Sequence, residues 1–195
     1  ILIVRLTMNP KRWKLISTKD VSPSKWFPIE ERTYELPNGK VVDDFTVSTL
    51  ADVALVVPVT KTREIVMVNQ FKPGVDEILI QFPGGRLENN HTSMIELAQH
   101  ELEEETGIFV SPQQLVPFAK LSGFSTKASE VVYFFLAKDC EFNSQQHLDI
   151  TEDIEVLTLQ PATVDQLVLS NKIWCAQSVA GWELAKKKFA RELGY

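Results

Sequence analysis

The pattern of apolar and polar positions predicts a mixed α/β protein. Residues 52–59 (DVALVVPV) are nearly all apolar and β-branched, and residues 64–70 (EIVMVNQ) repeat that character after a polar turn. Such unbroken apolar runs are typical of strands that are buried on both faces. Further strands are expected at 77–82 and 129–137, and the segment 83–85 (PGG) is expected to break the chain after the first of these.

Helices are predicted at 163–170 and 174–193, and another where Ser93 and Glu96 show the spacing of a capping box. Gly107 is a natural stop, so this last helix is expected to run from Met94 to Thr106. Strands and helices together indicate a mixed α/β fold.

The first 48 residues have a different character. A strand-like stretch at 25–36 leads to Pro37-Asn38-Gly39-Lys40, which carries the Asn-Gly signal of a tight hairpin turn, and a return strand follows at 41–47. We therefore predict two parts: residues 1–48 form an N-terminal strand and hairpin arm, and residues 49–195 form the main domain.

Acidic residues are crowded at the end of the predicted helix, in ELEEETG (101–107). On a helical projection Glu101, Glu104 and Glu105 fall along the edge of the apolar face. Glu101 and Glu105 repel each other at i and i+4, and carboxylates in a last turn also oppose the helix dipole. Two interpretations remain open: a solvated or lysine-paired helix end, or a site for Mg²⁺ or Mn²⁺, which prefer such oxygen ligands.

The charge and composition of the chain disfavour several classes of function. The formal net charge is −6 and the longest basic run is Lys186-Lys187-Lys188, so nucleic-acid binding is not favoured. No apolar stretch approaches the ~20 residues that cross a bilayer, so no membrane association is expected. The two cysteines, Cys140 and Cys175, form no Cys-x-x-Cys pair, which suits a reducing cytoplasm.

The stretch from Gly85 to Ile108 resembles the Nudix box. Glu101, Leu102, Glu104, Glu105, Gly107 and Ile108 match its second half, and Gly85 matches its first glycine if the loop holds one extra residue. Two positions depart from the pattern: His91 or Thr92 stands where an early glutamate belongs, and His100 replaces an arginine. The resemblance implies a Nudix-type α/β/α sandwich with a mixed sheet and a metal-dependent hydrolase.

Beyond the box, the chain is similar to the branch of ADP-ribose pyrophosphatases and nucleotide-sugar hydrolases. This resemblance implies a homodimer formed through the arm and hydrolysis of a nucleoside diphosphate linked to a sugar. It also implies the following roles: an ion held by Gly85, Glu101, Glu104 and Glu105, catalysis by Glu104 and Glu130, and substrate contacts from Trp26, Lys72, Gln81, Gly84 and Gly85.

Two other functions compete with hydrolysis. His91, His100 and Gln81 depart from the family pattern, which motivates a binding module that senses nucleotide sugars without cleaving them. A structural dimer with a vestigial site is the third possibility. Retention of three mutually repelling glutamates argues against it, because drift without function would relieve the repulsion.

Overall fold

The computed structural model describes residues 10–88 and 92–195, and the chain in it divides into two compact units. The first consists of residues 1–50 with 124–129, and the second consists of 51–123 with 130–195. Within the described residues, no helix combines the length and apolar character needed to cross a membrane.

The N-terminal unit is a three-stranded antiparallel sheet in the order β1 (Lys14–Asp20), β2 (Ile29–Glu35) and β3 (Val41–Ser48). The predicted hairpin joins β2 to β3, and Gly39 adopts a positive φ of 79° in its turn, as the Asn-Gly signal requires. The segment 124–129 belongs to this unit because Ala128 bridges Ser48 at the end of β3.

The second unit contains a seven-stranded mixed sheet. Its strands follow the order β10-β5-β4-β9-β8, with β6 beside β5 and β7 beside β4, and only β4 and β9 run parallel. The strands are β4 (Val53–Thr60), β5 (Ile65–Lys72), β6 (Glu77–Gln81), β7 (Gly84–Arg86), β8 (Leu115–Ser122), β9 (Val131–Cys140) and β10 (Ile154–Leu159).

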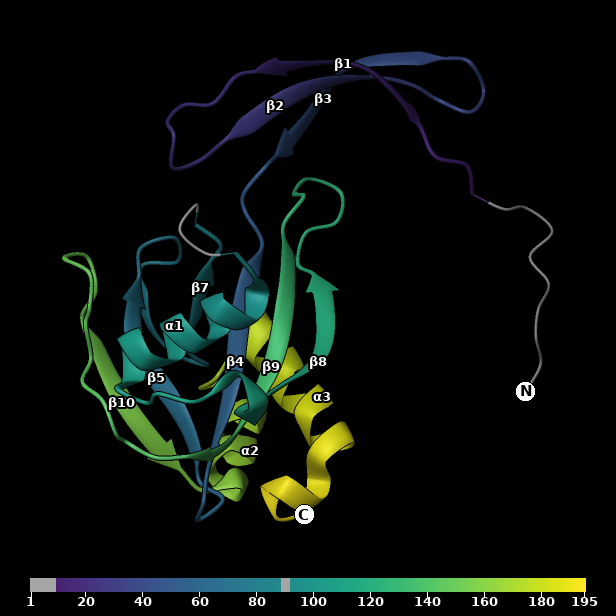
Figure 1. The fold of residues 1–195 in the computed structure, drawn as a ribbon. Helices are drawn as coiled ribbons and strands as arrows, with labels where there is room; N and C mark the ends of the chain where they lie inside the picture. Colours follow the sequence, from purple (N-terminus) through teal and green to yellow (C-terminus); the bar gives the residue numbers. More distant parts are fainter. Residues whose placement is uncertain (1–9, 89–91) are drawn as a thin grey trace, which may run out of the picture. The chain divides into compact units, whose positions relative to one another are not determined.

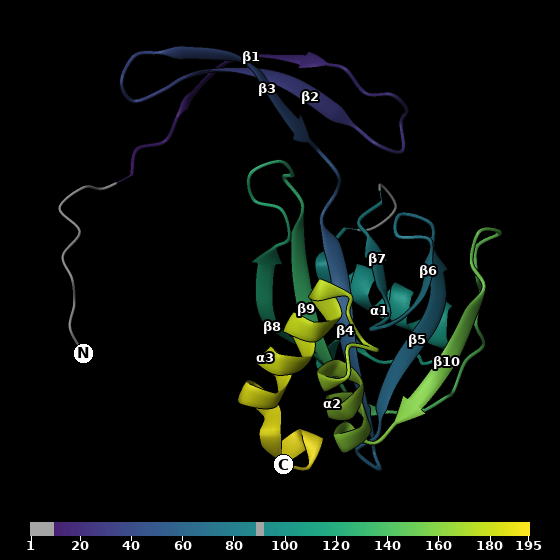
Figure 2. The ribbon, with the colours of Figure 1, turned by 180° about the vertical axis from the view of Figure 1, so that it is seen from behind.

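Helices cover both faces of this sheet, as Figures 1 and 2 show from opposite sides. Helix α1 (Met94–Thr106) packs Leu97, Ala98 and Leu102 against Val56 and Val66. On the other face, α2 (Pro161–Leu169) and α3 (Ala176–Leu193) pack residues such as Val164 and Trp182 against Leu55, Val57 and Met67. This is the α/β/α sandwich that was predicted.

Several elements differ from the sequence predictions. The segment at 83–85 is not a simple break, because Gly84 and Gly85 pair with β4 as part of the short strand β7. The arm's first predicted strand begins at Ile29 rather than at residue 25. Strands β1, β8 and β10 were not predicted: β1 is exposed at every position and gives no burial pattern, and β8 is interrupted by a bulge at Pro117.

Candidate active site

Helix α1 begins and ends where the sequence predicted. The Ser93 hydroxyl accepts a hydrogen bond from the Glu96 amide at 3.2 Å, and Gly107 closes the helix in the left-handed conformation with its N–H on the Glu103 carbonyl. The reciprocal half of the capping box is absent, because the Glu96 carboxylate accepts from the Thr92 amide instead. His91, the other candidate for the missing acid, lies outside the described residues.

Two glycines bring backbone directly against this helix. Gly84 has a φ of +153°, and a Cβ there would lie 2.2 Å from the Ala54 carbonyl oxygen, so only glycine fits beside β4. At Gly85 a Cβ would lie 2.3 Å from Glu101 Oε1. The Gly84 amide donates a hydrogen bond to Glu105 Oε2 at 2.8 Å, which fixes the orientation of that carboxylate.

The acidic cluster is held in an unfavourable electrostatic environment. Burial, and to a smaller extent the charges of Glu105 and Glu104, together raise the pKa of Glu101 to about 8. Glu105 is only 2% exposed, and burial raises its pKa to about 8 as well, although the Gly84 hydrogen bond and the positive charge of Lys72 oppose the shift. These two residues are therefore not a solvated acidic face.

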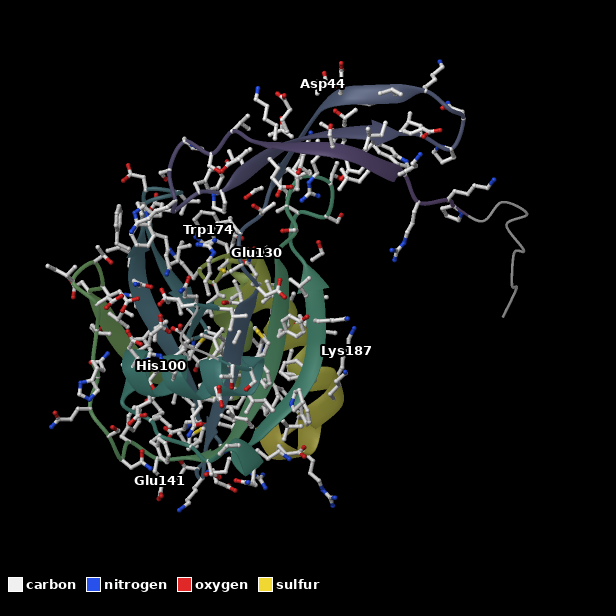
Figure 3. The ribbon with its side chains drawn as sticks, turned by 45° about the horizontal axis from the view of Figure 1, so that its top comes forward. Asp44, His100, Glu130, Glu141, Trp174 and Lys187 are labelled. Carbon is white, nitrogen blue, oxygen red and sulfur yellow. The ribbon has the colours of Figure 1, made fainter. Side chains whose placement is uncertain are left out.

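Glu104 lies beside them but is partly exposed. Burial raises its pKa, His100 opposes that shift, and the negative charges of Glu152 and Asp149 add to it. His100, labelled in Figure 3, lies one turn before Glu104 on α1, and its Nδ1 lies 3.0 Å from Glu104 Oε2. In residues 10–88 and 92–195, no three acidic, histidine or cysteine side chains are gathered closely enough to hold one metal ion in this conformation.

The chemistry of the cluster nevertheless suits a divalent cation. Glu101, Glu104 and Glu105 supply hard oxygen ligands, and the missing side chain at Gly85 leaves the Glu101 carboxylate open to the β7 backbone. A cation would also offset the desolvation and repulsion that raise the pKa values of Glu101 and Glu105. The residues present therefore fit a divalent ion.

Strand β5 carries polar residues at its end, including Gln70 and Lys72. Lys72 ends the strand, and its positive charge lowers the pKa of the Glu105 carboxyl. Gln70 is only 7% exposed, and its Oε1 has no hydrogen-bond partner among the described residues. Gln81, at the end of β6, is buried at 8% exposure, so it has little accessible surface for direct contact with a substrate in this conformation.

Glu130 directly precedes β9 and is labelled in Figure 3. Its side chain is 16% exposed, and Oε2 lies 3.3 Å from Nη2 of Arg86, the residue after Gly85. The next residue, Val131, donates its amide to Asp52 Oδ1 at 2.9 Å. Glu130 is therefore tied by its side chain to the strand that carries the two glycines.

Trp26 belongs to the N-terminal unit. The residue is 75% exposed, and Lys25 Nζ lies 4.4 Å from its ring centroid. The same unit has a pocket of about 460 Å³ lined by Trp13, Tyr34 and Phe45, with Arg12, Arg32 and residues of the 124–129 segment. Trp26 is not among the residues that line it.

Comparison with known proteins decides the family. The NUDIX domain profile matches residues 49–179, which is more than half of the chain and contains the glycine turn, α1 and Glu130. The chain belongs to the Nudix family. Members of this family generally use a divalent metal ion, in keeping with the acidic cluster of α1.

Individual relatives of this Nudix protein cover most of its length. It is 30% identical over 167 residues to the ADP-ribose pyrophosphatase of Bacillus subtilis (strain 168), with 85% of this chain and 88% of that protein aligned. It is 27% identical over 168 residues, with the same coverages, to the methanol dehydrogenase activator of Bacillus methanolicus. It is 34% identical over 109 residues to the ADP-sugar pyrophosphatase of Mus musculus, covering 51% and 50% of the two chains.

A solved structure confirms the fold. The crystal structure of an ADP compounds hydrolase superposes with a TM-score of 0.81 and covers 94% of this chain and 97% of its own. The sequence identity is 19%, so this likeness bears on the fold alone.

Two residues act on the candidate site although the sequence did not point to them. The negative charge of Glu152, which lies far along the chain, contributes to the raised pKa values of Glu101, Glu104 and Glu105. Ser178 on α3 is fully buried and accepts a hydrogen bond from the Phe82 amide at 3.0 Å, directly before the Pro83-Gly84-Gly85 turn. No motif or spacing in the sequence marks either residue, because only the tertiary fold brings it to the site.

Proposed function

We propose that this Nudix protein hydrolyses the diphosphate bond of a nucleoside diphosphate linked to a sugar, with ADP-ribose as the leading substrate. The observation that carries the proposal is the contact between the glycine turn and the acidic end of α1, where Gly84 binds Glu105 and Gly85 adjoins Glu101. The names of the B. subtilis and M. musculus relatives support the substrate class, and they favour catalysis over the sensor.

The reaction consumes water and breaks one P–O–P linkage, so ADP-ribose yields AMP and a ribose phosphate. In the proposed site, the backbone at Gly84 and Gly85 lets the diphosphate approach without a side chain in its path. Lys72 contributes positive charge beside the phosphates. Glu130 accepts a proton from the attacking water, and its contact with Arg86 orients the carboxylate toward the glycine turn.

We assign the metal to Glu101, Glu104 and Glu105 with the backbone of Gly85, and we propose Mg²⁺ or Mn²⁺ as the ion. We also propose that Glu104 takes part in catalysis, together with Glu130. When bound, such an ion neutralises the diphosphate charge and makes phosphorus more susceptible to attack by water. Gly84 keeps Glu105 oriented through the hydrogen bond at 2.8 Å, so the cluster is preorganised in part by backbone.

We further propose that the protein is a homodimer in the cytoplasm. The exposed apolar residues of the N-terminal unit, including Leu15, Ile16 and Phe27, offer a surface for a second copy. Trp26, which is exposed, is proposed to stack on the nucleotide base, and Gln81, which is buried, is proposed to act on the substrate side of the site. Cys140 and Cys175 are both free thiols, which supports a reducing compartment.

The test is a panel of diphosphates assayed with Mg²⁺ or Mn²⁺, with EDTA as the control. ADP-ribose, GDP-mannose and UDP-glucose would be compared by release of the nucleoside monophosphate. Metal-dependent release from ADP-ribose supports the proposal. Binding of ADP-ribose without release in any condition would instead support the nucleotide-sugar sensor.

A further inference from the structure

Residues 143–147, here called the strap, lie against the last turn of α1. The Ser144 amide donates to the Gly107 carbonyl at 2.9 Å, and the His147 amide donates to the Glu104 carbonyl at 3.0 Å. Between them, Gln146 Nε2 donates to the Glu105 carbonyl at 2.7 Å. Asn143 fixes the beginning of the strap by exchanging two hydrogen bonds with the Phe109 backbone, at 2.8 and 3.1 Å.

These donors occur where α1 most needs them. The last carbonyls of a helix have no partner within the helix and carry partial negative charge. In α1 this turn also holds the acidic cluster, and it contains no basic residue. The Gly107 amide donates to the Glu103 carbonyl, and the strap provides donors for the carbonyls of Glu104 and Glu105.

Gln146 is the one strap residue that reaches these carbonyls with its side chain. Its Nε2 also lies 3.4 Å from the Ile154 carbonyl on β10, so one amide group connects the end of α1 to the edge of the sheet. The bond to Glu105 fixes the backbone of the residue whose carboxylate accepts from Gly84. A shift of this backbone would move the carboxylate away from the glycine turn.

We propose that Gln146 is a positioning residue for the pyrophosphatase reaction, acting through the backbone of Glu105. The inference rests on the proposed role of the acidic cluster. It does not require that Gln146 touch the substrate, the ion or the attacking water. Its effect is therefore expected in kcat and in the response to divalent ions, with little change in KM for the nucleotide sugar.

Two substitutions test the proposal on the full-length protein. Gln146→Glu keeps the size of the side chain but turns a donor into a carboxylate facing two carbonyl oxygens. Gln146→Met removes the donor without adding charge. The matched control is Gln145→Glu, because Gln145 is the neighbouring residue, is exposed as Gln146 is, has no side-chain hydrogen bond within the described residues, and receives the same added charge.

We expect both Gln146 variants to lose at least about tenfold in kcat on ADP-ribose, a loss that corresponds to about 1.4 kcal/mol. The rise in melting temperature produced by Mn²⁺ should also be smaller in both variants. The Gln145→Glu control should match the parent in both measurements. Assays would be run well below each variant's melting temperature, and Gln146→Met decides the matter if Gln146→Glu does not fold.

Unchanged kcat and unchanged Mn²⁺ response in folded Gln146→Met would overturn the proposal. So would an equal loss in Gln145→Glu, since the effect would then come from charge alone. Failure of the proposed function has a different signature: the parent would release no monophosphate, or Glu105→Gln would be as active as the parent.

Discussion

At the scale of single residues, the glycines at 84 and 85 determine whether the acidic cluster can form. Gly85 has no room for a methyl group because the Glu101 carboxylate occupies that space. The contact is with the flexible end of a side chain, so an added methyl group displaces the carboxylate more readily than the backbone. The position is therefore expected to affect chemistry more than folding.

Gly85→Ala tests this expectation. We predict a loss of at least about tenfold in kcat, equivalent to about 1.4 kcal/mol, with a small change in melting temperature, because Glu101 must leave its place. Gly74→Ala is the matched control, since a Cβ at Gly74 meets nothing within 4 Å. Kinetics and thermal unfolding of both variants decide the point, and a fully active Gly85→Ala would show that the position of Glu101 is unimportant.

The raised pKa values of Glu101 and Glu105 predict how stability depends on pH in EDTA. Their folded pKa values of about 8 lie above the ordinary value of 4.5, so the folded state binds protons more tightly than the unfolded state. The stability that these two carboxyl groups contribute is therefore fully present below about pH 4.5 and is lost as the pH rises through 8. Glu101→Gln should reduce this loss. Denaturant unfolding between pH 5 and 8 measures how the free energy of unfolding changes with pH. An equal change in parent and variant would contradict the raised pKa of Glu101.

At the scale of elements, α3 supports the glycine turn from the opposite face of the sheet. Ser178 accepts from the Phe82 amide in a fully buried position, so its removal leaves a donor without a partner. We predict that Ser178→Ala lowers the free energy of unfolding by about 1–3 kcal/mol. Ser170→Ala, at an exposed helix end, should cost less than about 0.5 kcal/mol. Urea unfolding compares them, and equal stability would refute the supporting role.

The sequence predicted those elements that are marked by neighbouring residues, such as helix caps and apolar runs. Helix α1 was bounded correctly because Ser93 and Gly107 are a strong start and stop, and β4 and β5 were found because they are buried on both faces. Strand β7 was missed because its three residues gain their pairing only from β4. Gln146 and Glu152 were missed for the same reason: long-range packing brings them to α1, and no periodicity marks them.

For the whole molecule, the exposed apolar residues of the N-terminal unit lead us to predict self-association. The unit exposes Trp26 and Phe27 between β1 and β2 and Val41 at the start of β3, and its three strands provide little core of their own. We expect a dimer at micromolar concentration by light scattering, and we expect replacement of Trp26 and Phe27 by serine to weaken it. Leu169→Ser, which alters an exposed leucine on α2, is the control. A monomeric parent would exclude the homodimer.

We propose that the carboxylates of ELEEETG hold the divalent ion that hydrolysis requires. The most direct test compares AMP release from ADP-ribose by the parent and by Glu105→Gln, each with Mg²⁺ and with EDTA. Glutamine can still accept the hydrogen bond from Gly84, so the fold should persist and the metal-free melting temperature should hold or rise. We expect EDTA to abolish parental activity and the variant to lose at least about 100-fold in kcat, or about 2.7 kcal/mol. Parental turnover by Glu105→Gln would contradict this proposal.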